Sequence, residues 1–183
     1  MQRRSFLRSA AAAVPALGLH DLLSAAAQSS VAGLHVVHSG EDLFGHPHSL
    51  GFSTLLFKIS SSETSGGLFI IEHKNLSRGG PPLHLHLNQE EWFYVMEGEV
   101  AFAVGDQRLA LRAGESVLAP RRVPHTFSAV GTDPARMIIA FTPAGKMEQY
   151  FQDAPNQPAG ASPAEFFRRY DMEYLGPSPF WKS

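Results

Sequence analysis

The sequence predicts an all-β domain, built as a barrel or sandwich of short strands and followed by short helices. Between residues 35 and 141, short runs rich in Phe, Ile, Val, Leu and Tyr alternate with Gly, Pro, Ser and Asp, which is typical of strands joined by turns. The 16 Gly and 13 Pro among the 183 residues suit many tight turns. An apolar fraction of 44% is enough for the core of one domain of this length.

The expected strands follow one another with turn residues between them. Gly105 and Asp106, for example, mark a hairpin between two apolar runs. Strands at this spacing favour a barrel or sandwich over alternating strand–helix units. The predicted strands cover residues 51–59, 67–74, 91–96, 99–104, 107–111, 116–119, 125–130 and 136–141.

The pattern changes after residue 141, where two helices are expected over 146–152 and 163–174. Ser162 and Pro163 supply the N-cap and the first helical position of the second helix. The predicted organisation is an arm over 28–48, a barrel over 49–145 and a helical C-terminal extension over 146–183. The extension ends in Phe180 and Trp181, which we expect to pack on the barrel.

The N-terminus has the features of an export signal. Arg3 and Arg4 precede Ser-Phe-Leu, a moderately apolar run covers residues 10–19, and small residues follow at 25–27. The pattern resembles a twin-arginine signal peptide over residues 1–27, which implies contact with the twin-arginine export machinery and a periplasmic or secreted location. The apolar run is too short to span a bilayer, so we expect no stable membrane anchor. A helical arm with incidental arginines is the alternative.

The composition excludes several classes of site. The chain has no cysteine, so disulfides, zinc–thiolate sites and cysteine nucleophiles cannot occur. The formal net charge of -2 gives no reason to expect a nucleic-acid partner. Without cysteine thiolates, any metal would be held by nitrogen and oxygen atoms. Nine histidines are present to supply the nitrogen atoms.

Two stretches place metal-ligating residues close together. His84 and His86 are two residues apart, so on an extended chain both imidazoles point to one face. Glu91 begins the next strand, where its carboxylate can complete the set, and it is also the candidate catalytic base. Pro120 and Pro124 bracket a turn that delivers His125 at a strand start. His84, His86, Glu91 and His125 therefore predict a site for one divalent transition metal.

The same alternation predicts the wall of a substrate pocket. Phe93 and Val95 follow Glu91 at two-residue spacing, and Phe127 follows His125 in the same way, so all three should point inward beside the metal. Trp92 and Tyr94 should point outward, toward a second sheet or a partner subunit.

The two stretches resemble the paired motifs of the cupin superfamily. In the first motif His84, His86, Glu91 and Gly98 match, and in the second Gly114, Pro120 and His125 match. Three positions depart from the family pattern, in the loops beside the ligands: Gly79 is displaced by one residue, and Arg122 and Ala129 stand where the family has Gly and often Asn.

The resemblance covers roughly residues 49–145 and implies a single double-stranded β-helix, the cupin or jelly-roll barrel. The ligand set suits Fe, Mn, Ni, Co, Cu or Zn and does not choose among them. The one-domain form with helices after the barrel resembles quercetin 2,3-dioxygenase-like cupins, which implies a metal-dependent dioxygenase acting on a small aromatic or enol substrate. By the same resemblance, the protein is expected to form a homodimer.

Other functions and site residues stay open. The same ion could serve a non-redox isomerase or hydrolase, or the chain could be a non-enzymatic module that binds a small ligand. Lys58 could face into the barrel, although an outward position is favoured. His46 and His48 lie in a predicted loop with no carboxylate at matching distance. Arg121 and Arg122 could stand at the pocket mouth, although an exposed pair on a turn is the commoner case.

Overall fold

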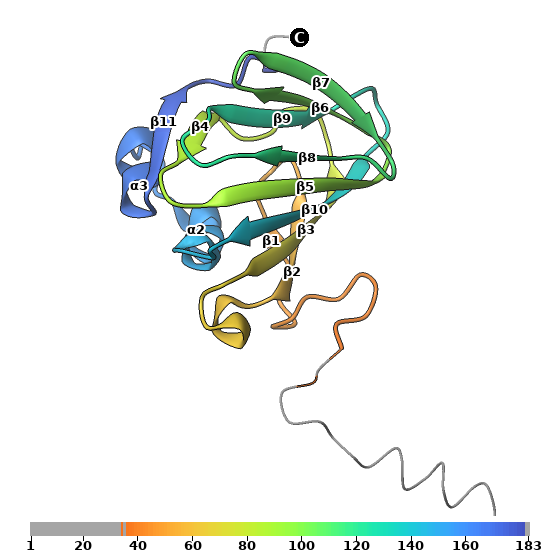
Figure 1. The fold of residues 1–183 in the computed structure, drawn as a ribbon, viewed down its shortest axis with the longest axis vertical. Coiled ribbons are helices and arrows are strands. Elements are labelled where there is room, and N and C mark those ends of the chain that lie inside the picture. The colour runs from red at the N-terminus through yellow and green to blue at the C-terminus, as the bar shows by residue number, and fades with distance from the viewer. Residues whose placement is uncertain (1–33, 35, 182–183) are drawn as a thin grey trace, which may run out of the picture. The chain divides into compact units, whose positions relative to one another are not determined.

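The computed structural model describes residue 34 and residues 36–181, and from Val37 onward the chain forms two facing antiparallel sheets (Figure 1). One sheet has the strand order β1-β2-β3-β10-β5-β8 and the other β11-β4-β9-β6-β7. The predicted all-β barrel with short C-terminal helices is confirmed. The strands are β1 His48–Ser49, β2 Thr54–Ile59, β3 Phe69–Leu76, β4 Leu83–His86, β5 Glu90–Glu97, β6 Glu99–Val104, β7 Gln107–Arg112, β8 Ser116–Ala119, β9 His125–Ala129, β10 Ala135–Thr142 and β11 Met172–Gly176.

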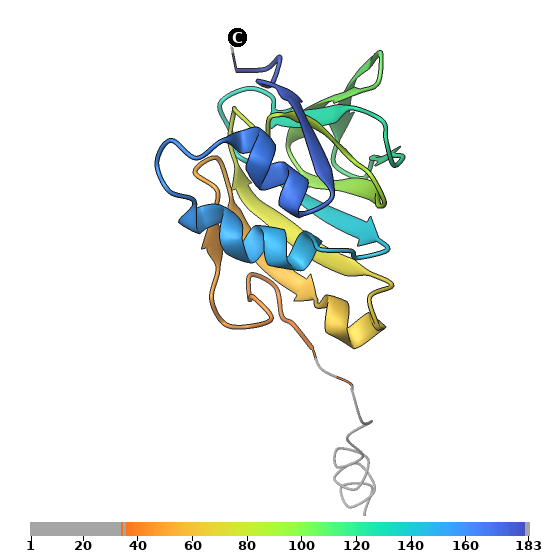
Figure 2. The ribbon, with the colours of Figure 1, turned by 90° about the vertical axis from the view of Figure 1, so that its left-hand side faces the viewer.

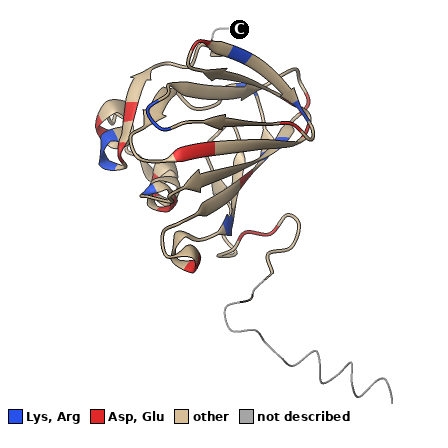
Figure 3. Ribbon diagram, viewed as in Figure 1, with Lys and Arg blue, Asp and Glu red and all other residues tan. Residues whose placement is uncertain are grey.

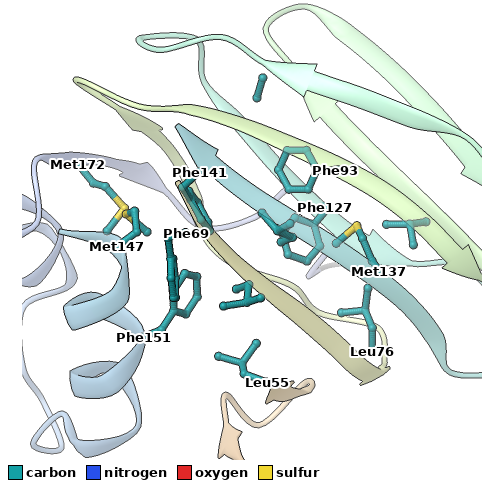
Figure 4. Close-up of a cluster of buried hydrophobic side chains, with 14 of the residues drawn as sticks. Leu55, Phe69, Leu76, Phe93, Phe127, Met137, Phe141, Met147, Phe151 and Met172 are labelled. Atoms are coloured by element: carbon teal, nitrogen blue, oxygen red, sulfur yellow. The ribbon is translucent and has the colours of Figure 1, made fainter. Parts of the chain in front are cut away.

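Alternating apolar residues of both sheets fill the space between them. Strand β10 lies between β3 and β5, and its Ile139 is registered with Ile71 on one side and Phe93 on the other. All three are buried. Figure 4 shows phenylalanines from several strands meeting in this core. Full burial of each such side chain stabilises the fold by about 1.5–3 kcal/mol.

Two helices cover one side of the barrel (Figure 2). Helix α2 spans Met147–Asp153 and buries Met147 and Phe151, which reach the core beside Phe69 and Phe141 (Figure 4). Helix α3 spans Pro163–Arg169 and buries Phe166 and Phe167. Short 3-10 helices lie at Ser61–Thr64 and Ala154–Asn156. The helices therefore form an apolar cover for this side of the barrel.

The predicted helix over 163–174 is too long. Ser162 caps α3 as expected, since its side chain accepts a hydrogen bond from the Glu165 amide. The helix ends at Arg169, and Asp171 takes a left-handed backbone conformation with φ of 59°. Residues Met172–Gly176 then form β11, which pairs with β4. The pairing partner is far away in sequence, so local pattern could not reveal it.

Strand β2 also starts later than expected. The predicted strand begins at residue 51, but Gly51 has φ of 81° and the Leu50 amide bonds the Ser53 carbonyl, so these residues form a turn. The extended segment that carries His84 and His86 is strand β4. Trp181 docks as predicted, through a hydrogen bond from its indole Nε1 to the Gly80 carbonyl of 3.2 Å.

Charged residues lie mostly on loops, strand ends and helices, with both signs interspersed in the view of Figure 3. Lys58 faces outward, as favoured, and with Arg136 it pairs with the buried carboxylate of Glu72. Within the described residues, no helix is long and apolar enough to cross a membrane. The predicted signal peptide over 1–27 lies outside the described residues.

Candidate metal centre and its cavity

Three strands bring the four predicted ligands together. His84 and His86 share one face of β4, and His125 opens β9, where it is registered opposite His84. Glu91 comes from β5 in the facing sheet. The ligands therefore span the barrel interior.

The four ligand groups are close and shielded from solvent. One ligand atom from each residue lies within 4.8 Å of all the others. Glu91 Oε2 lies 2.8 Å from His125 Nε2 and 3.0 Å from His86 Nε2. The exposed fraction is 6% for His84 and at most 3% for the other three. A single ion could contact all four residues.

Backbone carbonyls orient two of the imidazoles. His84 Nδ1 lies 2.9 Å from the Pro82 carbonyl, and His125 Nδ1 lies 2.9 Å from the Val123 carbonyl. A carbonyl only accepts hydrogen bonds, so each Nδ1 carries the proton and donates it. In the neutral ring, Nε2 then offers its lone pair to the cluster. This arrangement is common among metal-binding histidines.

The cluster electrostatics favour neutral histidines beside an ionised carboxylate. Burial, reinforced by His125 and His86, places the pKa of His84 well below its ordinary value, and burial also lowers the pKa of His86. Burial alone would raise the pKa of Glu91, but the close approach of His125 and His86 to its carboxylate outweighs that effect and holds the pKa well below the usual range. These are the protonation states that metal binding requires.

The donor set fits a divalent metal. Among the described residues, His86 Nδ1 and Nε2 are buried without a hydrogen-bond partner, because the 3.0 Å approach to Glu91 lacks hydrogen-bond geometry. Buried polar atoms without partners are rare in proteins. A cation between Glu91, His86 and His125 would satisfy the lone pairs that face one another there. Three imidazoles and one carboxylate suit transition metals.

A cavity of about 460 Å³ opens onto the cluster. Its walls come from both sheets and from the helical cover, and they are mostly apolar. Phe127 lines it as predicted, whereas Phe93 and Val95 are not among its lining residues and lie in the core, 1% and 0% exposed. These two point inward, but sheet packing separates them from the cavity. The lining also includes Ile139, Phe141, Met147, Tyr150, Phe151, Phe167 and Met172.

The three motif departures do not disturb the ligands. Arg122 has φ of 64°, the left-handed conformation that favours glycine, and its amide donates to the His86 carbonyl over 2.7 Å. Gly80, beside the displaced Gly79, is the glycine that the loop requires, since a Cβ there would lie 1.7 Å from the Phe127 carbonyl oxygen. Ala129 is a buried core residue of β9.

The structure also places the weaker candidates of the sequence outside the cluster. Arg121 is exposed, as expected, but its guanidinium pairs with Glu90 in two contacts of 2.5 and 2.7 Å. Glu90 is therefore the ion-pair partner of Arg121. His46 is exposed and His48 stacks on Phe57, and neither belongs to the metal cluster found among the described residues.

Sequence reasoning missed several polar residues of the cavity, His73 and Tyr150 among them. His73 shares the inward face of β3 with Phe69 and Ile71. A histidine that alternates with buried apolar residues along a strand could have indicated its inward position. Tyr150 lies on α2, and the way α2 packs over the barrel is not visible in local sequence pattern.

Comparisons with known proteins agree with this architecture. The cupin domain family matches residues 76–141. The chain is 33% identical over 94 residues to "Polyketide synthase CurC" of Streptomyces cyaneus, covering 49% of this chain and 57% of that protein. The chain spans about half the length of the curated relatives it matches.

Two solved structures show the same fold. An RmlC-like cupin from Shewanella frigidimarina superposes with a TM-score of 0.51 at 20% identity, over 63% of this chain and 96% of that one. The polyketide cyclase RemF from Streptomyces resistomycificus gives 0.51 at 20% identity, over 60% and 79%. The family match identifies residues 76–141 as a cupin domain, and the solved structures show that the chain has the cupin fold.

Proposed function

We propose that this cupin is a metal-dependent enzyme acting on a small aromatic or enolic substrate, with oxidative cleavage by O₂ as the leading reaction. One observation carries the proposal: four buried metal-ligating side chains open onto a largely apolar cavity of about 460 Å³. Cavities of this size hold small organic ligands. The resemblance to quercetin 2,3-dioxygenase-like cupins supports the choice of reaction.

Different residues of the chain would bind the metal, accept a proton and exclude water. His84, His86, Glu91 and His125 would hold the ion, which supplies Lewis acidity and, if it is a redox metal, reactivity toward O₂. Glu91 is an ionised carboxylate of the cluster and is the candidate group to accept the proton of an enol or phenol hydroxyl. Phe127, Phe141 and Phe167 line the cavity and exclude water around the substrate.

A second candidate is ring closure or isomerisation without O₂. The similarity to the polyketide synthase CurC favours it, because a polyketide offers enolic oxygens to the same ion and base. In that case Glu91 would move a proton and O₂ would not be consumed.

The test is oxygen uptake by protein purified without oxygen, after its metal content has been measured. With a redox metal bound, we expect O₂ consumption on adding a flavonol, and loss of that activity in Glu91→Gln even when its metal content is restored. Turnover without O₂ uptake would favour the second candidate. Saturable binding with no turnover would instead make the protein a ligand-binding module and contradict the enzymatic proposal.

Export and self-association also remain proposals. The paired arginines of residues 3–4 support twin-arginine export, and N-terminal sequencing of periplasmic protein would refute it by finding Met1. On the outer face of the first sheet, Trp92 and Leu118 are registered opposite each other and are 37% and 48% exposed. They would suit a homodimer interface, and a monomeric mass in sedimentation would exclude one.

A further inference from the structure

His73 is a buried histidine that faces the cavity and is not part of the metal cluster. It lies on the inward face of β3, is 2% exposed and lines the cavity wall. Its ring stacks on Phe52 at 6.2 Å between centroids and meets the edge of Phe127 at 5.5 Å. These contacts fix the orientation of the imidazole.

One side of this imidazole is occupied and the other is free. His73 Nδ1 lies 2.8 Å from the hydroxyl of Ser53, which is itself buried. His73 Nε2 makes no hydrogen bond to any residue that the structure describes, and it is not sealed in the protein interior as the His86 nitrogens are. A serine hydroxyl can donate or accept. His73 can therefore present either a donor or an acceptor to the cavity.

The register places His73 and Glu91 at different levels of the first sheet. Phe141 of β10 is opposite Glu91, whereas Met137 of the same strand is opposite His73. Four residues of strand separate these levels, or about 14 Å along β10. Ile139 lies between the two levels and lines the cavity. The cavity thus has polar groups at two separated positions with apolar walls between them.

The part of the cavity beside His73 carries no charge. Burial lowers the pKa of His73 to about 4, although the charge of Glu91 acts in the opposite direction. No Lys or Arg is among the residues that line this cavity. A carboxylate or phosphate would find no countercharge there, and its burial would be costly. An uncharged hydroxyl or carbonyl oxygen is the fitting partner.

We propose that His73, oriented by Ser53, is a second substrate anchor that binds an uncharged hydroxyl or carbonyl oxygen. The substrate class is then an aromatic molecule with a metal-binding oxygen at one end and a neutral oxygen-bearing group at the other. This inference rests on the proposed function, and it specifies the group at the end of the substrate that does not bind the metal. Tyr150 of α2 also lines the cavity and offers a hydroxyl on the helical side.

The test compares binding of three probes to zinc-loaded protein without oxygen, so that no turnover occurs. The probes are unsubstituted flavonol and two analogues with one additional hydroxyl, on the fused ring or on the pendant ring. We expect one analogue to bind the wild type about tenfold more tightly than the parent. His73→Phe keeps a flat ring but no polar atom, so it should abolish that preference. His73→Gln restores a polar group and should recover part of it.

Each result has a definite meaning. If the wild type binds the parent flavonol but neither hydroxyl improves affinity, or if the preference survives in His73→Phe, the anchor is wrong and the proposed function stands. An equal loss for all probes in His73→Phe, at an unchanged melting temperature, would also overturn the anchor. If no probe binds the zinc-loaded wild type, both the flavonol-type substrate class and the anchor fail.

Discussion

The identity of each metal ligand is set by where its side chain points. His84 and His86 share a face because side chains alternate along β4, and this follows from two-residue spacing alone. Their tautomers do not follow from sequence, because the Pro82 carbonyl reaches His84 only in the folded loop. The ligand residues could therefore be predicted from sequence, whereas the hydrogen bonds that orient their imidazoles depend on the fold.

The first prediction concerns the ligand His125. His125→Ala removes one of four donors and leaves Glu91 without its closest partner, at 2.8 Å. We expect at least a 100-fold loss of zinc affinity, measured by competition with a chromophoric chelator. His46→Ala is the matched control, since His46 is exposed. Equal affinity in the two variants would contradict the assigned cluster.

At the scale of elements, sequence pattern predicted strands better than their partners. Strands β6 and β8 have the expected bounds, because turn residues flank each of them. Local pattern instead predicts a helix through the start of β11, since the pairing of β11 with β4 joins distant parts of the chain. Phe93 was placed correctly on the inward face, but only sheet packing decides whether an inward residue meets the core or the cavity.

The second prediction concerns the loop that leads into β4. Gly80 has φ of 70° and a Cβ there would meet the Phe127 carbonyl, whereas Gly51 has φ of 81° with nothing within 4 Å. Gly80→Ala should lower the free energy of unfolding by at least about 3 kcal/mol, because the alanine strains the backbone and pushes strand β9 aside. Gly51→Ala should lower it by about 1 kcal/mol, because only the backbone is strained. Chemical denaturation of the two variants measures this difference. Equal losses would mean that the close approach does not constrain the loop.

At the scale of the whole molecule, the barrel keeps several histidines in a setting that disfavours their charged form. Burial is the main cause of the lowered pKa of His73, His84 and His86. The unfolded chain would take up protons at these residues once the pH falls below about 6.5, whereas the folded chain resists protonation. The metal-free protein should therefore lose stability as the pH falls below about 6.5, and His73 alone should contribute about 1.4 kcal/mol per pH unit until the pH nears its folded-state pKa of about 4.

A bound ion should oppose this acid sensitivity, since only the folded chain gathers all four ligands. Zinc at a thousand times its dissociation constant would add about 4 kcal/mol at neutral pH, or about 8–16 °C in melting temperature for a domain of this size. The gain should shrink toward pH 5, because each histidine must be unprotonated to bind. Thermal melts of chelated and zinc-loaded protein at pH 7.5 and pH 5 measure both effects. A melting temperature that zinc does not change at pH 7.5 would contradict the metal centre, and a chelated protein equally stable at both pH values would show that the buried histidines do not resist protonation.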